Sequence, residues 1–180
     1  MILSHQSRFN EFCTIQHPQR GKIKFKLYPY QYDVLDEFEK HDYNVVLKSR
    51  QLGISTLSAA YALWMMLFHN DKNILCIATS KDTAKNLVTK VRIMYEGLPN
   101  WLKTAIVENN KLSLIFKNGS QIKAIASNES AGRSEALSLL ILDEAAFIDK
   151  IDTIWTAAQQ TLATGGRCVA ISTPNGVGNW

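Results

Sequence analysis

Residues 48–56 form the segment of the sequence best suited to phosphate chemistry. They have the sequence Lys-Ser-Arg-Gln-Leu-Gly-Ile-Ser-Thr, follow a short apolar stretch and precede a longer apolar one. Phosphate-binding loops of the form G-x-x-x-x-G-K-[ST] occupy this place between a strand and a helix. Gly53 matches the second glycine of that pattern, and Ser55 matches the Ser/Thr whose hydroxyl binds Mg²⁺.

Two positions of the loop depart from this pattern. Lys48 stands where the first glycine is expected, and Ile54 stands where the lysine is expected. Backbone N–H groups at a helix N-terminus attract phosphate whatever the side chains are, and the long Lys48 side chain could fold over the phosphates. An ordinary strand-to-helix turn would have a similar sequence. If the loop binds ATP, we expect its contacts to come from Lys48, Ser49, Arg50, Gln51, Leu52, Gly53, Ile54, Ser55 and Thr56.

Two adjacent carboxylates, Asp143 and Glu144, follow an apolar stretch at residues 138–142. In ATP-hydrolysing P-loop proteins, an acid at this place holds Mg²⁺, and the next acid orients or activates the attacking water. Acids also occur as caps of helix starts, without any catalytic role. A carboxylate pair directly after a buried strand costs desolvation energy unless something uses it. We therefore predict Ser55 and Asp143 as Mg²⁺ ligands and Glu144 as the catalytic carboxylate.

Arginines in two loops are candidates for stabilising charge on a transferring phosphoryl group. Arg50 lies within residues 48–56, and Arg133 lies in the polar segment 127–135. A guanidinium near a γ-phosphate stabilises the charge that develops in the transition state. The alternative for Arg50 is an ordinary exposed arginine, and Arg133 is the weaker of the two candidates.

Polar residues in two further segments could contact the nucleotide. Gln31, beside Tyr28 and Tyr30, could hydrogen-bond an adenine edge, because an amide both donates and accepts; the alternative is an exposed glutamine. Ser172 and Thr173 end the last apolar stretch, where hydroxyls could sense a γ-phosphate. The alternative for this pair is the start of a turn before a proline.

The elements expected to position these residues alternate between strand and helix. Apolar runs predict strands at residues 44–47, 73–79, 138–142 and 167–173, and helical spacing predicts helices at 28–40, 55–69, 80–97 and 149–162. Thr79 and Asp82 have the spacing of a helix capping box. Asn118-Gly119 between two alternating stretches predicts a hairpin of residues 111–116 and 121–126.

This alternation predicts an α/β domain with a mostly parallel sheet. Right-handed crossovers would place the ends of the four parallel strands at one edge of the sheet, where ligands of such folds bind. We also expect the strands that precede Lys48 and Asp143 to be neighbours. The predicted site is therefore the crevice beyond these strand ends.

Composition is that of an ordinary folded domain with a charge bias at its start. The chain has 180 residues, 46% hydrophobic and 20% charged, which excludes disordered and collagen-like chains. Residues 1–30 hold five basic side chains and one acid, and so carry the net charge of +4. This basic segment could contact DNA, or it could be a solvated strand in which Lys22, Lys24 and Lys26 alternate with apolar residues.

The compartment is suggested by apolar runs and cysteines. The longest apolar run, residues 57–68, is too short to cross a bilayer, and no secretory signal is visible. Three cysteines lie far apart without metal-binding spacing, and Cys76 and Cys168 lie within apolar runs. These features predict buried thiols in a reducing cytoplasm, with no membrane contact.

Taken together, these motifs resemble one family, the large terminase subunit of tailed bacteriophages, and within it the N-terminal packaging ATPase domain. The similarity covers nearly the whole chain. The segments that carry it are Phe9–Leu27, Tyr30-Gln31, residues 49–53 with Ser55-Thr56, residues 140–145, and Ser172-Thr173-Pro174-Asn175-Gly176.

The resemblance implies an additional-strand P-loop ATPase of RecA-like type that hydrolyses ATP with Mg²⁺. It further implies a ring of such subunits, docked on the portal protein of an empty shell in the host cytoplasm, that pumps double-stranded DNA with the help of a small terminase subunit. Arg50 would act as a cis-acting arginine, Glu144 as the catalytic carboxylate, Tyr30 and Gln31 as adenine contacts, and Lys48 as the displaced lysine. Residues 172–176 would couple hydrolysis to motion.

The implied domain organisation is a lead-in at residues 1–27 and an ATPase domain at 28–180. Trp180 follows the last apolar stretch closely, which suggests a piece of a longer chain. In the family a DNA-cutting nuclease domain follows, so we expect no nuclease activity from these residues themselves.

Two other functional classes compete with this interpretation. A superfamily-2 helicase would share a glutamine motif and an Asp-Glu pair, but the chain is too short for the second RecA-like domain of a helicase. A catalytically inactive fold that only binds DNA or the portal would explain Ile54 as the sign of a lost site. ATP turnover with and without Mg²⁺, and separation of DNA strands, distinguish the three.

Overall fold

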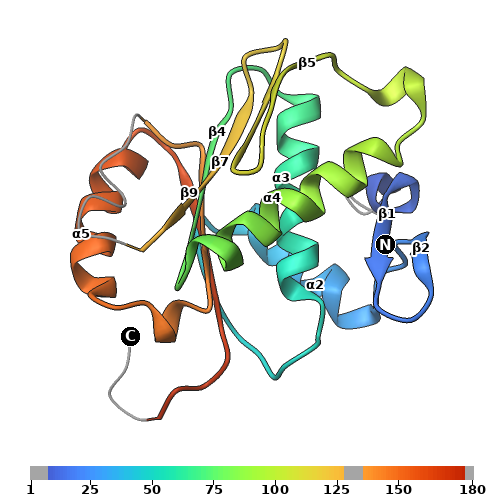
Figure 1. The fold of residues 1–180 in the computed structure, drawn as a ribbon. Helices are drawn as coiled ribbons and strands as arrows, with labels where there is room; N and C mark the ends of the chain where they lie inside the picture. The colour runs from blue at the N-terminus through green and yellow to red at the C-terminus, as the bar shows by residue number, and fades with distance from the viewer. Residues whose placement is uncertain (1–7, 128–135, 177–180) are drawn as a thin grey trace.

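The computed structural model describes residues 8–127 and 136–176, in which helices and strands alternate (Figure 1). The helices are α2 (Pro29–Lys40), α3 (Ile54–Phe68), α4 (Lys81–Glu96) and α5 (Ile151–Leu162), with 3₁₀ turns η1 (Asn10–Phe12), η2 (Asn100–Leu102) and η3 (Ala145–Phe147). The strands are β1 (Thr14–His17), β2 (Gly21–Lys24), β3 (Tyr43–Leu47), β4 (Asn73–Ala78), β5 (Ile106–Asn109), β6 (Ser113–Phe116), β7 (Gln121–Ala126), β8 (Leu139–Asp143) and β9 (Arg167–Ser172).

The central sheet has the strand order β3–β9–β8–β4–β7–β6–β5. Strands β3, β9, β8, β4 and β7 are parallel, and β6 runs antiparallel to both β7 and β5 at one edge. The prediction of a mostly parallel α/β sheet with a hairpin insertion is confirmed. Because these five strands run in the same direction, their C-terminal ends lie at one edge of the sheet, and β4 points downward toward that edge in Figure 1.

Helices cover both faces of this sheet, with α3 and α4 on one side and α5 on the other (Figure 1). The side chains of β8 show why a continuous apolar strand is needed between them. Leu139 and Ile141 belong to the core beneath α3 and α4, whereas Leu140 and Leu142 belong to the core beneath α5. Because successive side chains of a strand point to opposite faces, both faces of β8 are buried.

The predicted hairpin is confirmed, and one strand that the sequence did not predict pairs with it. β6 and β7 join through a turn in which Gly119 has a φ of +80°, the left-handed conformation that glycine adopts readily. β5 lies on the outer edge, and only Ile106 of its four residues is partly buried. Its weak apolar pattern explains why periodicity alone did not reveal it.

Two sequence-based expectations were wrong in detail. The strands that carry the two motifs, β3 and β8, are not neighbours, because β9 lies between them and pairs with both. This arrangement brings Ser172, the last residue of β9, and Thr173, which follows it, between the two motif loops. The cap of α4 is Ser80, whose hydroxyl accepts a hydrogen bond from the Thr83 N–H at 3.2 Å, and not Thr79.

The N-terminal segment packs against the domain through its apolar side. Lys22, Lys24 and Lys26 are exposed, whereas Phe25 is buried in the core, as the alternating pattern predicts. Strands β1 and β2 form a separate two-stranded antiparallel sheet beside α4. Residues 14–24 are therefore part of the folded body and not a free basic arm.

The cysteines are all buried and unpaired, as predicted from their apolar surroundings. Burial raises the pKa of the Cys13 thiol to about 12. Within the described ranges, no helix combines the length and the hydropathy that crossing a membrane requires.

Candidate active site

The loop between β3 and α3 makes the sharp turn that the motif requires. Gly53, which precedes the first residue of α3, has a φ of +72°, and no side chain caps the helix there. The Leu57 N–H donates to the Gly53 carbonyl at 2.9 Å and so begins the helix. The N–H groups of the first turn of a helix have no partner within it, and they carry partial positive charge. This turn therefore presents free donors to an anion.

The first turn of α2 holds this loop in place. The Leu52 carbonyl accepts hydrogen bonds from the Tyr30 hydroxyl at 2.7 Å and from Gln31 Nε2 at 3.1 Å. Gln31 Oε1 accepts from the Tyr28 N–H at 3.0 Å, and the Gln31 side chain is buried. Both ends of the Gln31 amide thus bind protein groups, while the adenine contacts of Tyr30 and Gln31 stay predictions.

Ser55 and Asp143, which were predicted as Mg²⁺ ligands, lie in direct contact. The Ser55 hydroxyl donates to Asp143 Oδ1 at 2.9 Å, and Asp143 is buried at the end of β8. A hydroxyl and a carboxylate oxygen side by side suit Mg²⁺, which binds oxygen ligands and completes its coordination with phosphates and water. Within the part of the chain that is described, no group of three or more His, Cys, Asp or Glu side chains forms another metal site.

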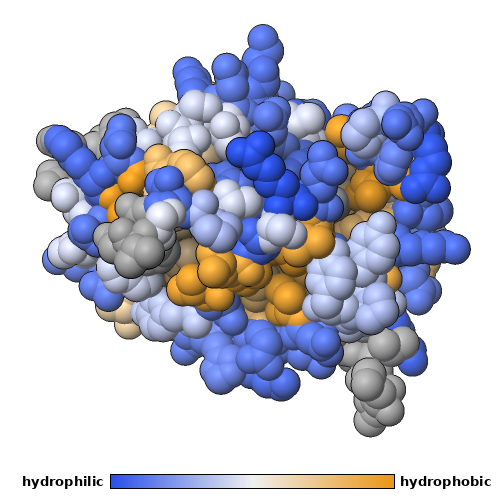
Figure 2. Space-filling view, turned by 90° about the horizontal axis from the view of Figure 1, so that it is seen from below, coloured by the Kyte–Doolittle hydropathy of each residue, from blue (hydrophilic) through white to orange (hydrophobic). Residues whose placement is uncertain are grey.

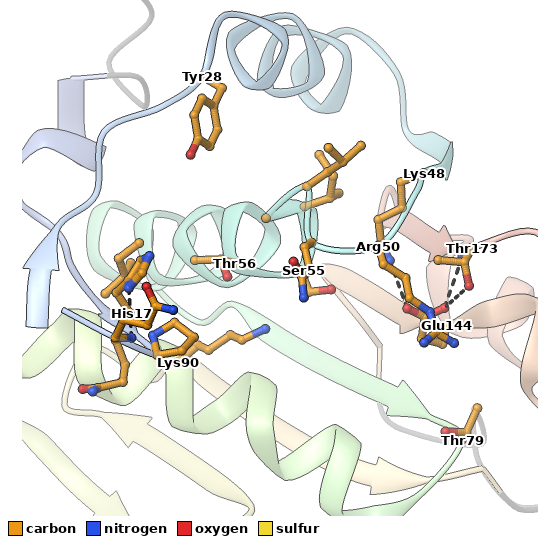
Figure 3. A pocket seen from close by; sticks show the side chains of 18 of the residues that line it. His17, Tyr28, Lys48, Arg50, Ser55, Thr56, Thr79, Lys90, Glu144 and Thr173 are labelled. Atoms are coloured by element: carbon orange, nitrogen blue, oxygen red, sulfur yellow. Dashed lines mark hydrogen bonds and ion pairs between the residues drawn. The ribbon is translucent and has the colours of Figure 1, made fainter. Parts of the chain in front are cut away.

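Glu144 is held from two sides by Lys48 and Thr173 (Figure 3). Lys48 Nζ lies 2.9 Å from Glu144 Oε1, and the Thr173 N–H and hydroxyl donate to Glu144 Oε2 at 3.2 and 3.1 Å. Burial alone would raise the pKa of the Glu144 carboxyl, but the hydrogen bonds from Lys48 and Thr173 hold this pKa below its usual range. Glu144 is therefore ionised at neutral pH.

The backbone at Glu144 has an unusual conformation for a non-glycine residue, with a φ of +55°. Such left-handed positions cost energy and gather at functional sites. The residues around it are tied to the end of β9: the Ser172 hydroxyl accepts from the Ala146 N–H at 3.0 Å, and Asn175 Nδ2 donates to the Ala146 carbonyl at 2.8 Å. The two predicted nucleotide contacts, Ser172 and Thr173, therefore have different partners. Thr173 hydrogen-bonds the Glu144 carboxylate, and Ser172 hydrogen-bonds the backbone N–H of Ala146.

A cavity of about 1190 Å³ opens at this site, and Gly53, Ser55 and Thr173 are among the residues that line it. Lys48, Arg50 and Lys90 contribute its lysine and arginine side chains, and Glu144 contributes its carboxylate. Of the predicted loop contacts, Ser49 is exposed outside the cavity, and Ile54 is 2% exposed and also packs in the core. Figure 2 shows the molecule from below; on the face seen there, hydrophobic surface lies in the middle and hydrophilic residues surround it.

The opposite wall of the cavity comes from residues that the sequence did not single out. Strand β1 contributes Gln16 and His17, the turn after it contributes Gln19, and α4 contributes Lys90. The ring of Tyr28 also lines the cavity; it is 61% exposed and stacks on Tyr30 with ring centroids 5.7 Å apart. No local pattern marks these residues, because only the fold brings β1 and α4 opposite the loop. Arg133 lies outside the described residues.

Residues 45–180 match the family model described as "Terminase large subunit, T4likevirus-type, N-terminal". The chain belongs to this family. The matched region contains the phosphate loop, the Asp143-Glu144 pair and β9, which lies between β3 and β8 in the sheet. These are the segments that form the candidate site.

Solved structures support the same fold. The Thermus phage P74-26 large terminase ATPase domain has a TM-score of 0.66 at 23% identity, over 85% of this chain and 67% of that one. The bacteriophage HK97 large terminase has a TM-score of 0.72 at 22% identity, over 93% of this chain and 36% of that one. A large terminase from a thermophilic bacteriophage, solved with ATP-gamma-S, has a TM-score of 0.59 at 14% identity, over 82% of this chain and 38% of that one.

These findings confirm the predicted family and the additional-strand P-loop fold of a terminase ATPase domain. The chain spans little more than a third of the HK97 large terminase. What the complete packaging protein does beyond this domain is therefore a matter for proposal.

Proposed function

We propose that this terminase domain binds ATP with Mg²⁺ and hydrolyses it to drive movement of double-stranded DNA. The observation that carries the proposal is the contact of Glu144 with Lys48. The preceding residue, Asp143, contacts Ser55 in the first turn of α3, where the helix N–H groups have no side-chain cap. A phosphate chain seated on that helix start would lie between the Mg²⁺ ligands and the catalytic carboxylate.

Each residue has a role that follows from its position. Ser55 and Asp143 hold Mg²⁺, which when bound neutralises charge on the β- and γ-phosphates. Glu144 orients the attacking water and accepts its proton, and Thr173 fixes the second oxygen of that carboxylate. Lys48, at the base of the loop, moves its ammonium from Glu144 to the phosphates, and the exposed Arg50 stabilises the charge of the transition state.

The displaced lysine supports an active site over an inactive fold. Ile54 leaves no ammonium at the usual position, yet the Lys48 side chain is only 8% exposed and its Nζ reaches the catalytic carboxylate. A buried lysine is costly to maintain unless its charge is used, and its partner Glu144 is itself partly exposed. The alternative of a lost site has no such observation in its favour.

The packaging context is the finer part of the proposal. We place the working domain in a homo-oligomeric ring on the portal protein in the host cytoplasm, with the small terminase subunit delivering double-stranded DNA. Family membership supports this assignment, and so does the exposure of Lys22, Lys24 and Lys26 on the basic N-terminal segment. The boundary between a lead-in at 1–27 and an ATPase domain at 28–180, with a nuclease domain beyond, also remains a proposal.

The test is phosphate release by the purified chain with Mg²⁺ and with EDTA, followed by displacement of a triplex-forming strand from duplex DNA. We expect slow Mg²⁺-dependent hydrolysis from the isolated domain, and displacement only once ring assembly and DNA are supplied. Absence of turnover in every condition would favour the inactive fold, and separation of the duplex strands would favour a helicase. Metal-dependent nicking of plasmid that persists in an Asp143→Ala control would contradict the absence of nuclease activity.

A further inference from the structure

Helix α4 directs one lysine into the ATP cavity from the wall opposite the phosphate loop. Lys90 lines that cavity, and it also lines a smaller adjoining one with Gln16 and Thr56. Figure 3 shows its side chain extending from α4 across the cavity toward Ser55 and Thr56. Lys48 approaches the same helix start from the other side.

Within the described residues, the ammonium of Lys90 is not paired with a carboxylate in the way that Lys48 is with Glu144. Among the residues that the structure describes, none forms a hydrogen bond or an ion pair with it, although its side chain is half-buried. Arg92, one half-turn further along α4, instead donates to Asn109 Oδ1 at 2.6 Å. A half-buried ammonium without partners is unfavourable in the free protein, because it loses water without gaining an acceptor.

The electrostatic surroundings agree with this picture. Burial lowers the pKa of Lys90, and the Lys48 ammonium acts in the same direction, while the carboxylate of Asp143 opposes both. Asp143 does not pair with Lys90, and its Oδ1 accepts from Ser55. A site of this kind gains most from an added anion.

The balance of charge around the cavity points to the same missing partner. Glu144, the carboxylate that lines the cavity, already accepts from Lys48. Arg50 is exposed on the loop, so its side chain can remain hydrated. Lys90 is half-buried like Lys48, but among the described residues no carboxylate contacts its ammonium, which extends toward Ser55 and Thr56 (Figure 3). Neither Gln16 nor Thr56 beside it carries a compensating negative charge.

We infer that Lys90 binds the triphosphate of ATP from the α4 side, as a second lysine that closes on the phosphate chain opposite Lys48. The inference rests on the ATP site proposed above and adds a substrate-binding residue to it. Occupation of the cavity supplies the acceptors that the ammonium lacks. The lysine missing at position 54 is then replaced by two lysines, one from each side of the start of α3.

The test compares Lys90→Met, which removes the charge, with Lys90→Arg, which keeps it. Lys81→Met is the matched control, because Lys81 is an exposed lysine of the same helix outside the cavity. Binding of ATP-gamma-S and of inorganic tripolyphosphate is measured by calorimetry. We expect Lys90→Met to raise both dissociation constants about tenfold or more, which corresponds to about 1.4 kcal/mol. Lys81→Met should stay near the parent chain, and Lys90→Arg, which keeps the charge, should bind more tightly than Lys90→Met.

Thermal unfolding separates this role from a structural one. Without nucleotide, Lys90→Met should melt no lower than the parent chain, since it removes an unpartnered buried charge; with ATP-gamma-S it should show a smaller rise in Tm. A lower Tm without nucleotide, combined with an unchanged affinity, would make Lys90 a structural residue and overturn the inference. An unchanged affinity of Lys90→Met for ATP-gamma-S would also overturn the inference, whatever the Tm of the variant.

A measurement on the unmodified chain covers the case in which the variants fold poorly. Acetylation of Lys90 by an amine-reactive ester, followed by mass spectrometry, should slow several-fold when ATP-gamma-S is bound, while acetylation of Lys81 does not change. Equal acetylation of Lys90 with and without nucleotide would refute the contact. Failure of the parent chain to bind ATP-gamma-S would overturn the ATP site itself together with this inference.

Discussion

Lys48 Nζ and Glu144 Oε1 lie 2.9 Å apart, so the lysine at the base of the loop and the carboxylate proposed as catalytic neutralise each other. The two residues come from the ends of β3 and β8, which are separated by β9 in the sheet. A lysine engaged in this way cannot at the same time contact phosphate through the same donors. The ammonium has three donors, so the proposed transfer of Lys48 to phosphate would leave Glu144 without this partner only if the donor on Glu144 moves as well.

Glu144→Gln should abolish ATP hydrolysis and leave nucleotide binding intact. The amide keeps the shape of the carboxylate, but it cannot accept a proton from water. Its single oxygen can accept from Lys48 or from Thr173, not from both, because its other end is an NH₂ donor. Phosphate release and ATP-gamma-S binding measure the two effects separately. Asp143→Asn serves as the comparison, since it should weaken Mg²⁺-dependent binding itself. Equal turnover in Glu144→Gln and the parent chain would refute the role of Glu144.

Lys48→Ala should lower ATP turnover by about 10²-fold or more, as expected for loss of a preorganised charge at a transferring phosphoryl group. In the Lys48→Ala background, Ile54→Lys should restore part of the lost turnover by placing an ammonium at the usual position of the loop lysine. Ile54 is 2% exposed in the core, so the new lysine should also lower the Tm. Turnover and unfolding are therefore measured for all four variants of the cycle.

The result of this cycle also decides between two cations. Full activity in Lys48→Ala would remove the lysine from the mechanism and leave Arg50 as the cation of the loop. In the parent background, Ile54→Lys should have little effect or reduce turnover, because it brings two ammonium groups together.

Gly53→Ala should destabilise the fold by about 1–2 kcal/mol and weaken nucleotide binding. The residue has a φ of +72°, and an added Cβ would lie 2.9 Å from Gln31 Nε2. Gly21→Ala is the control: its φ is +67°, but nothing lies within 4 Å of the added Cβ. Denaturant unfolding should show the larger loss for Gly53→Ala, and equal losses would mean that the contact with Gln31 is unimportant.

The stability of the free domain should fall in acid, partly through Glu144. Hydrogen bonds from Lys48 and Thr173 hold the pKa of this carboxyl below its unfolded value, so its contribution is present above that value and is lost as the pH falls through the lower one. The window opens at about pH 4.3, the usual value for Glu. Because Glu144 is partly exposed, the effect should be about 1 kcal/mol or less.

The check is the difference in unfolding free energy between the parent chain and Glu144→Gln, measured from pH 7 to pH 3. We expect the parent to be more stable at pH 7 and the difference to shrink below about pH 4.3. A difference that is independent of pH would show that the ion pair contributes nothing.

Sequence reasoning was most successful where chemistry follows the end of a strand. Lys48, Ser55, Asp143 and Glu144 were predicted to converge, and they do, because parallel strands end at one edge of their sheet. Local residues suffice for such a prediction, since each motif carries its own strand. The parallel topology then supplies the long-range contact.

Other features could not be derived from local patterns. The position of β9 between β3 and β8 depends on which strands pair with each other in the folded sheet. The sequence of one strand does not determine this pairing. Gln31 has the chemistry to contact adenine, yet its amide hydrogen-bonds the Leu52 carbonyl and the Tyr28 N–H, a choice that depends on the path of the loop. Lys90 is one of several lysines in its region of the sequence, and only the packing of α4 distinguishes it.

The double hydrogen bond at the Leu52 carbonyl has a mechanical consequence. Tyr30 and Gln31 clamp this single peptide from the first turn of α2, while Gly53 next to it forms the pivot at which α3 begins. A shift of that peptide must either pull the start of α2 along or break both bonds. Movement of the phosphate loop would therefore be transmitted to α2 through these two hydrogen bonds.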